Sequence, residues 1–203
     1  MTTRQRDENR LRTLISQECA RIMVEEGVKD FLLAKRKAAA RLCITNKASL
    51  PANVEIEQAR MEYQRLFKSS KQPAQLRAMR AAAVEAMTFL SRFQPKLVGA
   101  VLNGTTGPHS EVNLHLFADT SEEVVLFLAE HNIPFAMSER RLRLSNGQYG
   151  YFPALSFTAG ETNMELMVFA GKARYEAPRS PIDGRPMRRA SLAEVRILLN
   201  EEC

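Results

Sequence analysis

The spacing of the apolar residues changes once along the chain, at Pro95. Before Pro95, apolar residues recur every three or four positions, which is the period of a helix that buries one face. After Pro95 they alternate with polar residues, which is the period of a strand that buries one face. Both periods in separate blocks of one chain predict an α+β fold. We expect an N-terminal helical region followed by a mixed, mostly antiparallel sheet of about five strands, with helices on one face.

The same pattern predicts three parts in the chain of 203 residues. Residues 1–72 form a basic helical region, residues 73–171 an α+β domain, and residues 172–203 a tail with a short helix. This length is sufficient to bury a hydrophobic core in one domain or in two small ones.

Four helices are expected before the sheet. Gly27 separates the first two because glycine readily ends a helix, Asn53 can cap the third, and Pro73 can open the fourth. The expected helices span residues 7–26, 28–43, 54–67 and 74–92.

Turn residues divide the second block into strands. Asn146 and Gly147 predict a hairpin, because both tolerate a positive φ, and Pro153 predicts an edge position or a bulge in the strand that follows. Thr120 and Glu123 have the spacing of a capping box, which predicts a helix ending near residues 130–132. The expected strands span residues 97–103, 111–117, 135–144, 149–158 and 163–169, and a last helix spans 191–200.

Composition excludes several classes of protein. No apolar run approaches the roughly 18 residues that cross a bilayer, and the first residues lack the apolar core of a signal peptide. Cys19, Cys43 and Cys203 are odd in number and far apart, which argues against a disulfide framework or a zinc site. We therefore expect a soluble cytoplasmic protein with no membrane partner.

Charge is distributed unevenly along the chain. Residues 1–95 hold 18 Lys and Arg against 10 Asp and Glu, whereas residues 96–171 hold 4 against 8. Since phosphate attracts basic residues regardless of base sequence, the basic N-terminal helices are a candidate surface for nucleic acid. The alternative is that these residues only solvate the helices.

The stretch LVGAVLNGTTGPHSEVNLHLFA, residues 97–118, holds the candidate site. Two apolar runs flank a glycine-bearing turn, and Glu111, Asn113 and His115 alternate with apolar residues in the second run. Residues two apart in a strand point to the same face, so these three side chains should line up beside the turn.

This arrangement resembles the signature of the DNA-polymerase-beta-like nucleotidyltransferase superfamily, in which a strand ends in a Gly-Ser or Gly-Gly turn. A second strand then carries two carboxylates at i and i+2. The resemblance covers residues 76–169. It implies that Gly104, Thr105 and Thr106, with Ser110 and His115, bind the phosphates of a nucleoside triphosphate. It also implies that Glu111 and Asn113 hold Mg²⁺ and take part in catalysis.

A third carboxylate in that superfamily comes from a later strand, and Glu165 within Met164–Phe169 matches it. Glu165 is then the third catalytic and metal-binding residue. The strings HSEVNLHLFAD and SPIDGRPMRRA also look like those of a group of bacterial proteins built on this core. In that group Asn replaces the second carboxylate. Because Asn113 is neutral, the site has lost one metal-binding charge, which predicts weakened or lost catalysis.

Several of these residues have alternative interpretations. Glu165 could face water or pair with Arg141 or Arg143, and His115 could be a hydrogen-bonded structural residue. The arginine-bearing tail, residues 180–189, could wrap over the core or contact phosphate. Two functions follow: a nucleotidyltransferase-like protein that binds a nucleotide with Mg²⁺, an enzyme if transfer is retained, or a non-catalytic module that binds nucleic acid or protein.

Overall fold

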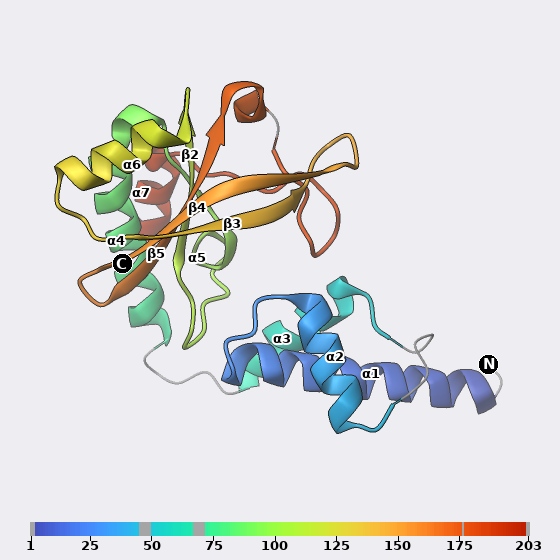
Figure 1. Cartoon of the computed structure of the whole chain (residues 1–203). Coiled ribbons are helices and arrows are strands. Elements are labelled where there is room, and N and C mark those ends of the chain that lie inside the picture. The colour runs from blue at the N-terminus through green and yellow to red at the C-terminus, as the bar shows by residue number, and fades with distance from the viewer. Residues whose placement is uncertain (1–2, 45–49, 67–71, 176, 202–203) are drawn as a thin grey trace. The chain divides into compact units, whose positions relative to one another are not determined.

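The computed structural model describes residues 3–44, 50–66, 72–175 and 177–201, and the chain divides into two compact units (Figure 1). The helical unit comprises residues 1–70 with 107–109 and 181–183. The sheet unit comprises residues 71–106, 110–180 and 184–203. The expected end of the third helix at residue 67 and the cysteine at 203 lie outside the described residues.

Three helices make up the described part of the helical unit: α1 (Thr3–Glu25), α2 (Phe31–Arg41) and α3 (Asn53–Leu66). Helix α1 packs against both of the others. Asp30 caps α2 by accepting a hydrogen bond from the Leu33 N–H at 2.7 Å. Buried side chains from all three helices form the core of the unit, namely Ile15, Cys19, Ile22, Ala34, Ala38 and Ile56.

The sheet unit begins with α4 (Gln72–Phe89) and a short 3₁₀ turn, η2 (Ser91–Phe93). Its strands are β1 (Lys96–Val98), β2 (Val112–Ala118), β3 (Ala136–Arg143), β4 (Tyr149–Ala159) and β5 (Thr162–Ala170). Between and after them lie α5 (Gly99–Asn103), α6 (Ser121–Glu130), η3 (Gly171–Tyr175) and α7 (Leu192–Asn200).

The strands form one mixed sheet in the order β1-β2-β5-β4-β3. Strands β2 and β5 are parallel, and every other neighbouring pair is antiparallel. This confirms the predicted α+β class with a mostly antiparallel sheet of five strands.

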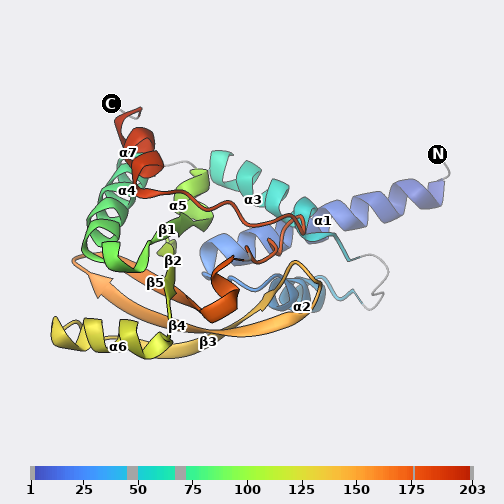
Figure 2. The ribbon, with the colours of Figure 1, turned by 90° about the horizontal axis from the view of Figure 1, so that it is seen from above.

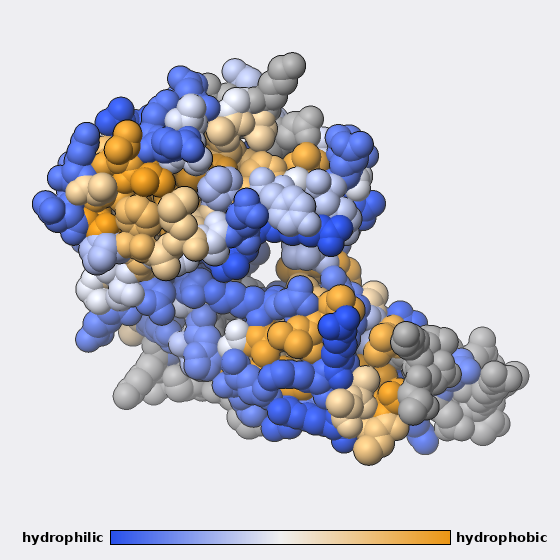
Figure 3. All heavy atoms as spheres, viewed as in Figure 1, coloured by the Kyte–Doolittle hydropathy of each residue, from blue (hydrophilic) through white to orange (hydrophobic). Residues whose placement is uncertain are grey.

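Helices α4, α6 and α7 cover one face of the sheet (Figure 2). Leu114 and Leu116 of β2 and Leu166 of β5 are fully buried beneath them. The alternation of residues along β2 directs these leucines toward the helices and Asn113 and His115 to the other face. Figure 3 shows hydrophobic residues on the surface over α6, and Leu126 of this helix is exposed.

The other face has a small aromatic cluster of Phe117, Phe152 and Phe169. The last part of the tail runs to β1 before α7 begins, as the red trace in Figure 2 shows. There the backbones of Leu97 and Ala190 exchange two hydrogen bonds of 2.9 Å. The tail is therefore paired with the edge of β1 at Ala190, and the choice between a wrap and a phosphate-contacting arm for residues 180–189 stays a prediction.

The first strand is shorter than predicted. Only Lys96–Val98 is strand, and residues 99–103 form α5. Val101 and Leu102 are buried like the strand residues before them, and a continuous apolar run does not distinguish a strand from a buried helix. The prediction of a strand over 97–103 was wrong for this reason.

The predicted capping box at Thr120 was also wrong, because the Thr120 side chain makes no capping hydrogen bond to α6. A capping box forms instead at α7, where Ser191 and Glu194 satisfy each other's backbone N–H groups. Pro153 lies within β4, but the ladder with β5 ends at Ala154, so Pro153 pairs with β3 alone. Its missing N–H therefore leaves the ladder with β5 intact.

Candidate functional site

The glycine that turns the chain after β1 is Gly99. It adopts a φ of +76°, a conformation that residues with a Cβ rarely take. A Cβ added at Gly99 would lie 3.5 Å from Nδ2 of Asn113. The turn beside the polar residues of β2 is therefore at Gly99, five positions before the glycine that the sequence pattern selected.

Gly104 instead ends α5. It has a φ of +71°, and its N–H and that of Thr105 both donate to the Ala100 carbonyl. Thr106 is buried, and its carbonyl accepts from Nε2 of Gln72 at 2.7 Å. These backbone groups terminate a helix and fasten the loop to α4. The sequence-based proposal that the N–H groups of Gly104 and Thr105 hold phosphate requires them to leave the Ala100 carbonyl.

The polar residues of β2 lie on one face, as the alternation predicted. Glu111 directly precedes the strand, and its carbonyl accepts from Nδ2 of Asn113 at 3.2 Å. Asn113 is opposite Val98 in β1 and opposite Glu165 in β5. Ser110 precedes Glu111 in the connection from α5. The glycine turn, Asn113 and Glu165 thus occupy three adjoining elements, β1, β2 and β5.

Glu165 forms an ion pair with Arg140 of β3. Oε1 of Glu165 accepts from Nε of Arg140 at 2.9 Å and also from Nη2. The Glu165 side chain is 10% exposed, whereas the Arg140 side chain is 44% exposed. The sequence named Arg141 and Arg143 as alternative partners, but neighbouring residues of a strand point to opposite faces. Arg140 compensates the cost of burying the carboxylate.

His115 is a buried residue with a partner from the tail. Nε of Arg189 donates to Nδ1 of His115 at 3.0 Å, and the guanidinium also lies over the rings of Phe117 and Phe169. Burial, followed by the charge of Arg189, lowers the pKa of His115 to about 3. The ring is therefore neutral, with Nδ1 as an acceptor, and it does not offer a positive charge to phosphate.

In this position the guanidinium of Arg189 does not form all of its possible hydrogen bonds. Nη2 of Arg189 is buried and has no hydrogen-bond partner among the described residues. Burial also lowers the pKa of Arg189. This arginine fastens the tail to β2 and to the aromatic cluster.

The donor set does not fit a resident Mg²⁺ ion. Within residues 3–44, 50–66, 72–175 and 177–201, no group of three or more His, Cys, Asp or Glu side chains could hold a metal. Asn113 is neutral, and Glu165 is already paired with Arg140. Mg²⁺ needs oxygen ligands that are not neutralised by another cation.

The basic residues of the helical unit are extensively paired within it. Arg21 and Arg41 both contact Glu18, and Lys37 donates to Glu26 at 2.8 Å. Hydrogen bonds from Arg21 lower the pKa of Glu18, with a further contribution from Arg41. These carboxylates offset part of the positive charge that the sequence assigned to a nucleic-acid surface, so that assignment stays a prediction.

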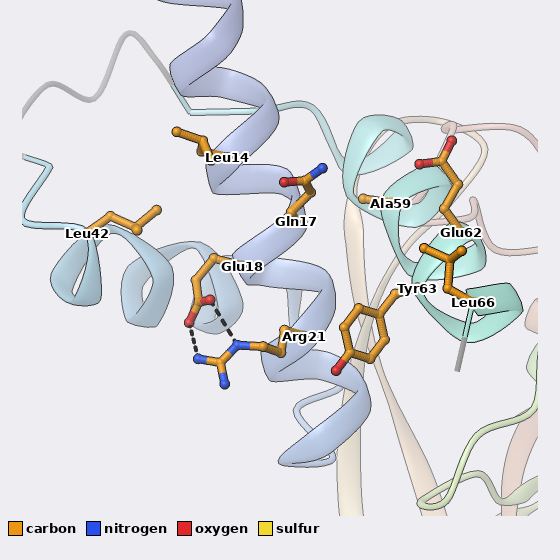
Figure 4. Close-up of a pocket in the computed structure, with 9 residues that line it drawn as sticks. All are labelled: Leu14, Gln17, Glu18, Arg21, Leu42, Ala59, Glu62, Tyr63 and Leu66. Carbon is orange, nitrogen blue, oxygen red and sulfur yellow. Dashed lines mark hydrogen bonds and ion pairs between the residues drawn. The ribbon is translucent and has the colours of Figure 1, made fainter. Parts of the chain in front are cut away.

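The helical unit also has a cavity of about 380 Å³ between its three helices (Figure 4). Figure 4 shows Leu14 from α1 and Leu66 from α3 among its lining, with the Glu18–Arg21 ion pair beside them. Arg21 is held by Glu18 and by Glu25. Leu14, Leu42, Ala59 and Leu66 give the lining an apolar part, and Arg21 is paired with Glu18, so the cavity suits an apolar side chain better than a phosphate.

Sequence reasoning missed three residues of the sheet site: Gly99, Arg140 and Arg189. Gly99 follows the apolar pair Leu97–Val98 directly, and that position was the available signal. The other two carried no local signal, because the partner of a strand arginine depends on strand order, and the partner of a tail arginine depends on the path of the tail.

Comparison of the chain with protein-family models, curated proteins and solved structures finds no match. The resemblance to nucleotidyltransferases therefore stays a prediction. Among the described helices, none is both long enough and apolar enough to cross a membrane.

Proposed function

We propose that the sheet unit binds a nucleoside triphosphate beside the Gly99 turn, as a nucleotidyltransferase-like protein. The observation that supports this is the placement of Gly99, Asn113 and Glu165 on adjoining elements. A glycine turn after one strand and polar residues on the next two strands are the features that the resemblance implies for a nucleotide site.

The chemistry of this face suits an anionic ligand. Gly99 lacks a side chain, so a phosphate can approach its backbone closely. Arg140 is 44% exposed and presents a guanidinium beside Asn113's register partner, Glu165. Lys96 of β1 is half-buried on the same face, opposite His115. Lys96, the exposed part of the Arg140 guanidinium and the glycine turn favour binding of the triphosphate, although the Arg140–Glu165 pair carries no net charge.

We propose that the protein binds the nucleotide but does not transfer its nucleotidyl group efficiently. Of the three carboxylate positions in the resemblance, residue 113 is an amide and Glu165 is neutralised by Arg140. In this proposal Mg²⁺ is held by the phosphates of the nucleotide and binds together with it.

Calorimetric titration of the full chain with ATP, CTP, GTP and UTP, with and without Mg²⁺, tests the proposal. At least one nucleotide should bind. Gly99→Ala should weaken that binding about tenfold or more, which corresponds to about 1.4 kcal/mol, since a Cβ there would stand beside Nδ2 of Asn113, where the proposal puts the phosphate. No heat from any of the four nucleotides would overturn the proposal.

Gly160→Ala is the matched control. Gly160 also has a positive φ, of +59°, but a Cβ there would meet nothing within 4 Å. Both variants place alanine in the left-handed region, so both should lose a similar amount of folding stability. Equal losses of nucleotide affinity in the two variants would show that Gly99 affects binding through stability alone.

A further inference from the structure

The β3–β4 hairpin has an exposed surface that the nucleotide site does not use. Tyr149 and Tyr151 of β4 are 55% and 64% exposed. In the antiparallel register they lie opposite Arg143 and Arg141 of β3. We call these four residues the tyrosine–arginine strip. In Figure 1 the turn end of the hairpin extends away from α4, α6 and α7.

The strip lies on the face of the sheet opposite to Glu165. Arg140 and Phe152 pair with each other and point to the Glu165 face, so their neighbours Arg141 and Tyr151 point to the other face. The strip therefore does not rest on the proposed nucleotide site, and variants of one surface leave the other unchanged.

An aromatic ring and a guanidinium group are in direct contact within the strip. The Arg141 guanidinium carbon lies 3.9 Å from the centre of the Tyr149 ring, a cation–π contact between diagonal neighbours. A Cβ added at Gly147 would lie 4.0 Å from Nη2 of Arg143, so that guanidinium lies near the turn. The two tyrosines are two residues apart on one strand and present their rings to the same side.

The pattern differs from ordinary exposure of single aromatic residues. Two large rings more than half exposed, each opposite an arginine, combine stacking surfaces with positive charge. These positive groups lie within residues 96–171, which hold 8 acidic residues against 4 basic ones. Two of those four basic residues, Arg141 and Arg143, are on the strip with one acidic neighbour on the same face of β3, Glu139, whereas Arg140 is paired with Glu165 on the other face.

We propose that the tyrosine–arginine strip binds single-stranded nucleic acid. Bases stack on the exposed rings, and the arginines contact the backbone phosphates and extend the stacking surface. Stacking depends on the π-face that every base has, so the strip takes RNA or DNA with little preference for sequence. Paired bases in a duplex cannot stack on the rings, so duplex should bind more weakly.

Fluorescence anisotropy with a short labelled oligouridylate and the matching oligothymidylate tests this with the full chain. The double variant Tyr149→Thr/Tyr151→Thr should bind about tenfold or more weakly, whereas Tyr149→Phe/Tyr151→Phe, which keeps both rings, should bind like the wild type. Threonine suits a strand, so the hairpin should still form. Arg141→Gln/Arg143→Gln should weaken binding and reduce its dependence on salt.

Tyr175→Ala is the matched control, because Tyr175 is also a well-exposed tyrosine of the sheet unit but lies outside the hairpin. It should leave binding unchanged. Failure of both oligonucleotides to bind, or unchanged binding by the threonine variant, would overturn the proposal. Unchanged binding by the threonine variant would indicate that another basic surface binds the nucleic acid. Failure of both oligonucleotides to bind would favour a protein partner for the strip.

Discussion

Nε of Arg189 donates a hydrogen bond to Nδ1 of His115 at 3.0 Å, which joins the tail to the centre of the sheet. The bond requires that Nδ1 carry no proton. Burial and the neighbouring positive charge lower the pKa of His115 to about 3, so the folded protein meets this requirement at neutral pH. The pair links the protonation of one ring to the attachment of the tail.

The first prediction concerns acid stability. In the unfolded chain a histidine titrates near pH 6.5, whereas folded His115 stays neutral to about pH 3. Between these values the unfolded state binds more protons, so the free energy of unfolding falls as the pH falls. His115 contributes a slope of about 1.4 kcal/mol per pH unit at most. Urea unfolding at several pH values measures it.

His115→Gln is the comparison for this measurement, because the amide oxygen can still accept from Arg189 but does not titrate. The two proteins have the same carboxylates; in the wild type the cationic Arg189 contacts the ring, and Lys96 is the register partner of His115 in β1. The difference between the two proteins isolates His115. An equal pH slope in both proteins would contradict the assignment of a neutral buried ring.

A second prediction concerns the Arg140–Glu165 ion pair. Arg140→Ala should lower the free energy of unfolding by about 2 kcal/mol, because it leaves a nearly buried carboxylate without its partner. Adding Glu165→Gln should recover part of that loss, since the neutral amide is less costly to bury. A double-mutant cycle in urea measures the coupling. Strictly additive effects would indicate that the pair makes no net contribution.

A third prediction compares two helix starts. Ser191→Ala removes both hydrogen bonds of the Ser191 hydroxyl in the capping box of α7 and should cost about 1 kcal/mol. Thr120→Ala should cost only a few tenths of a kcal/mol, because the Thr120 side chain makes no capping hydrogen bond. Thermal unfolding of the two variants measures the difference. A larger loss in the Thr120 variant would refute the assignment.

The fourth prediction addresses Mg²⁺. Without nucleotide, Mg²⁺ should leave the melting temperature of the wild type unchanged, since the described residues offer no metal-binding group. The variant Asn113→Asp/Arg140→Ala restores a carboxylate and releases Glu165, so Mg²⁺ should raise its melting temperature. Asn113→Asp alone, with Arg140 retained, is the control. Stabilisation of the wild type by Mg²⁺ would show that the site already holds the ion.

The large elements of the fold were predictable because their apolar periods are long and regular. Strand β2, with Leu114 and Leu116 inward and Asn113 and His115 on the other face, follows directly from alternation. Residues 99–103 were not predictable in this way. Residues 97–102 are apolar without alternation, and the positive φ of Gly99 marks the point where β1 ends and α5 begins.

The candidate site was predictable only in its local part. Alternation within one strand places Asn113 and His115 on one face, but their partners come from β5, β3 and the tail. Which arginine reaches Glu165 depends on the order of β5, β4 and β3 in the sheet, and a single sequence does not specify that order. For the same reason, the pairing of Arg189 with His115 appears only once the tail is traced.

The two backbone hydrogen bonds between Leu97 and Ala190 constrain how this protein can be made. The outer edge of β1 is covered by a segment translated long after the strand itself, and buried Val195 of α7 joins the core later still. A nascent chain stalled before Ala190 would expose an open sheet edge and an incomplete core, both of which promote aggregation. Chaperones that shield such intermediates on the ribosome should therefore bind this chain until α7 has emerged.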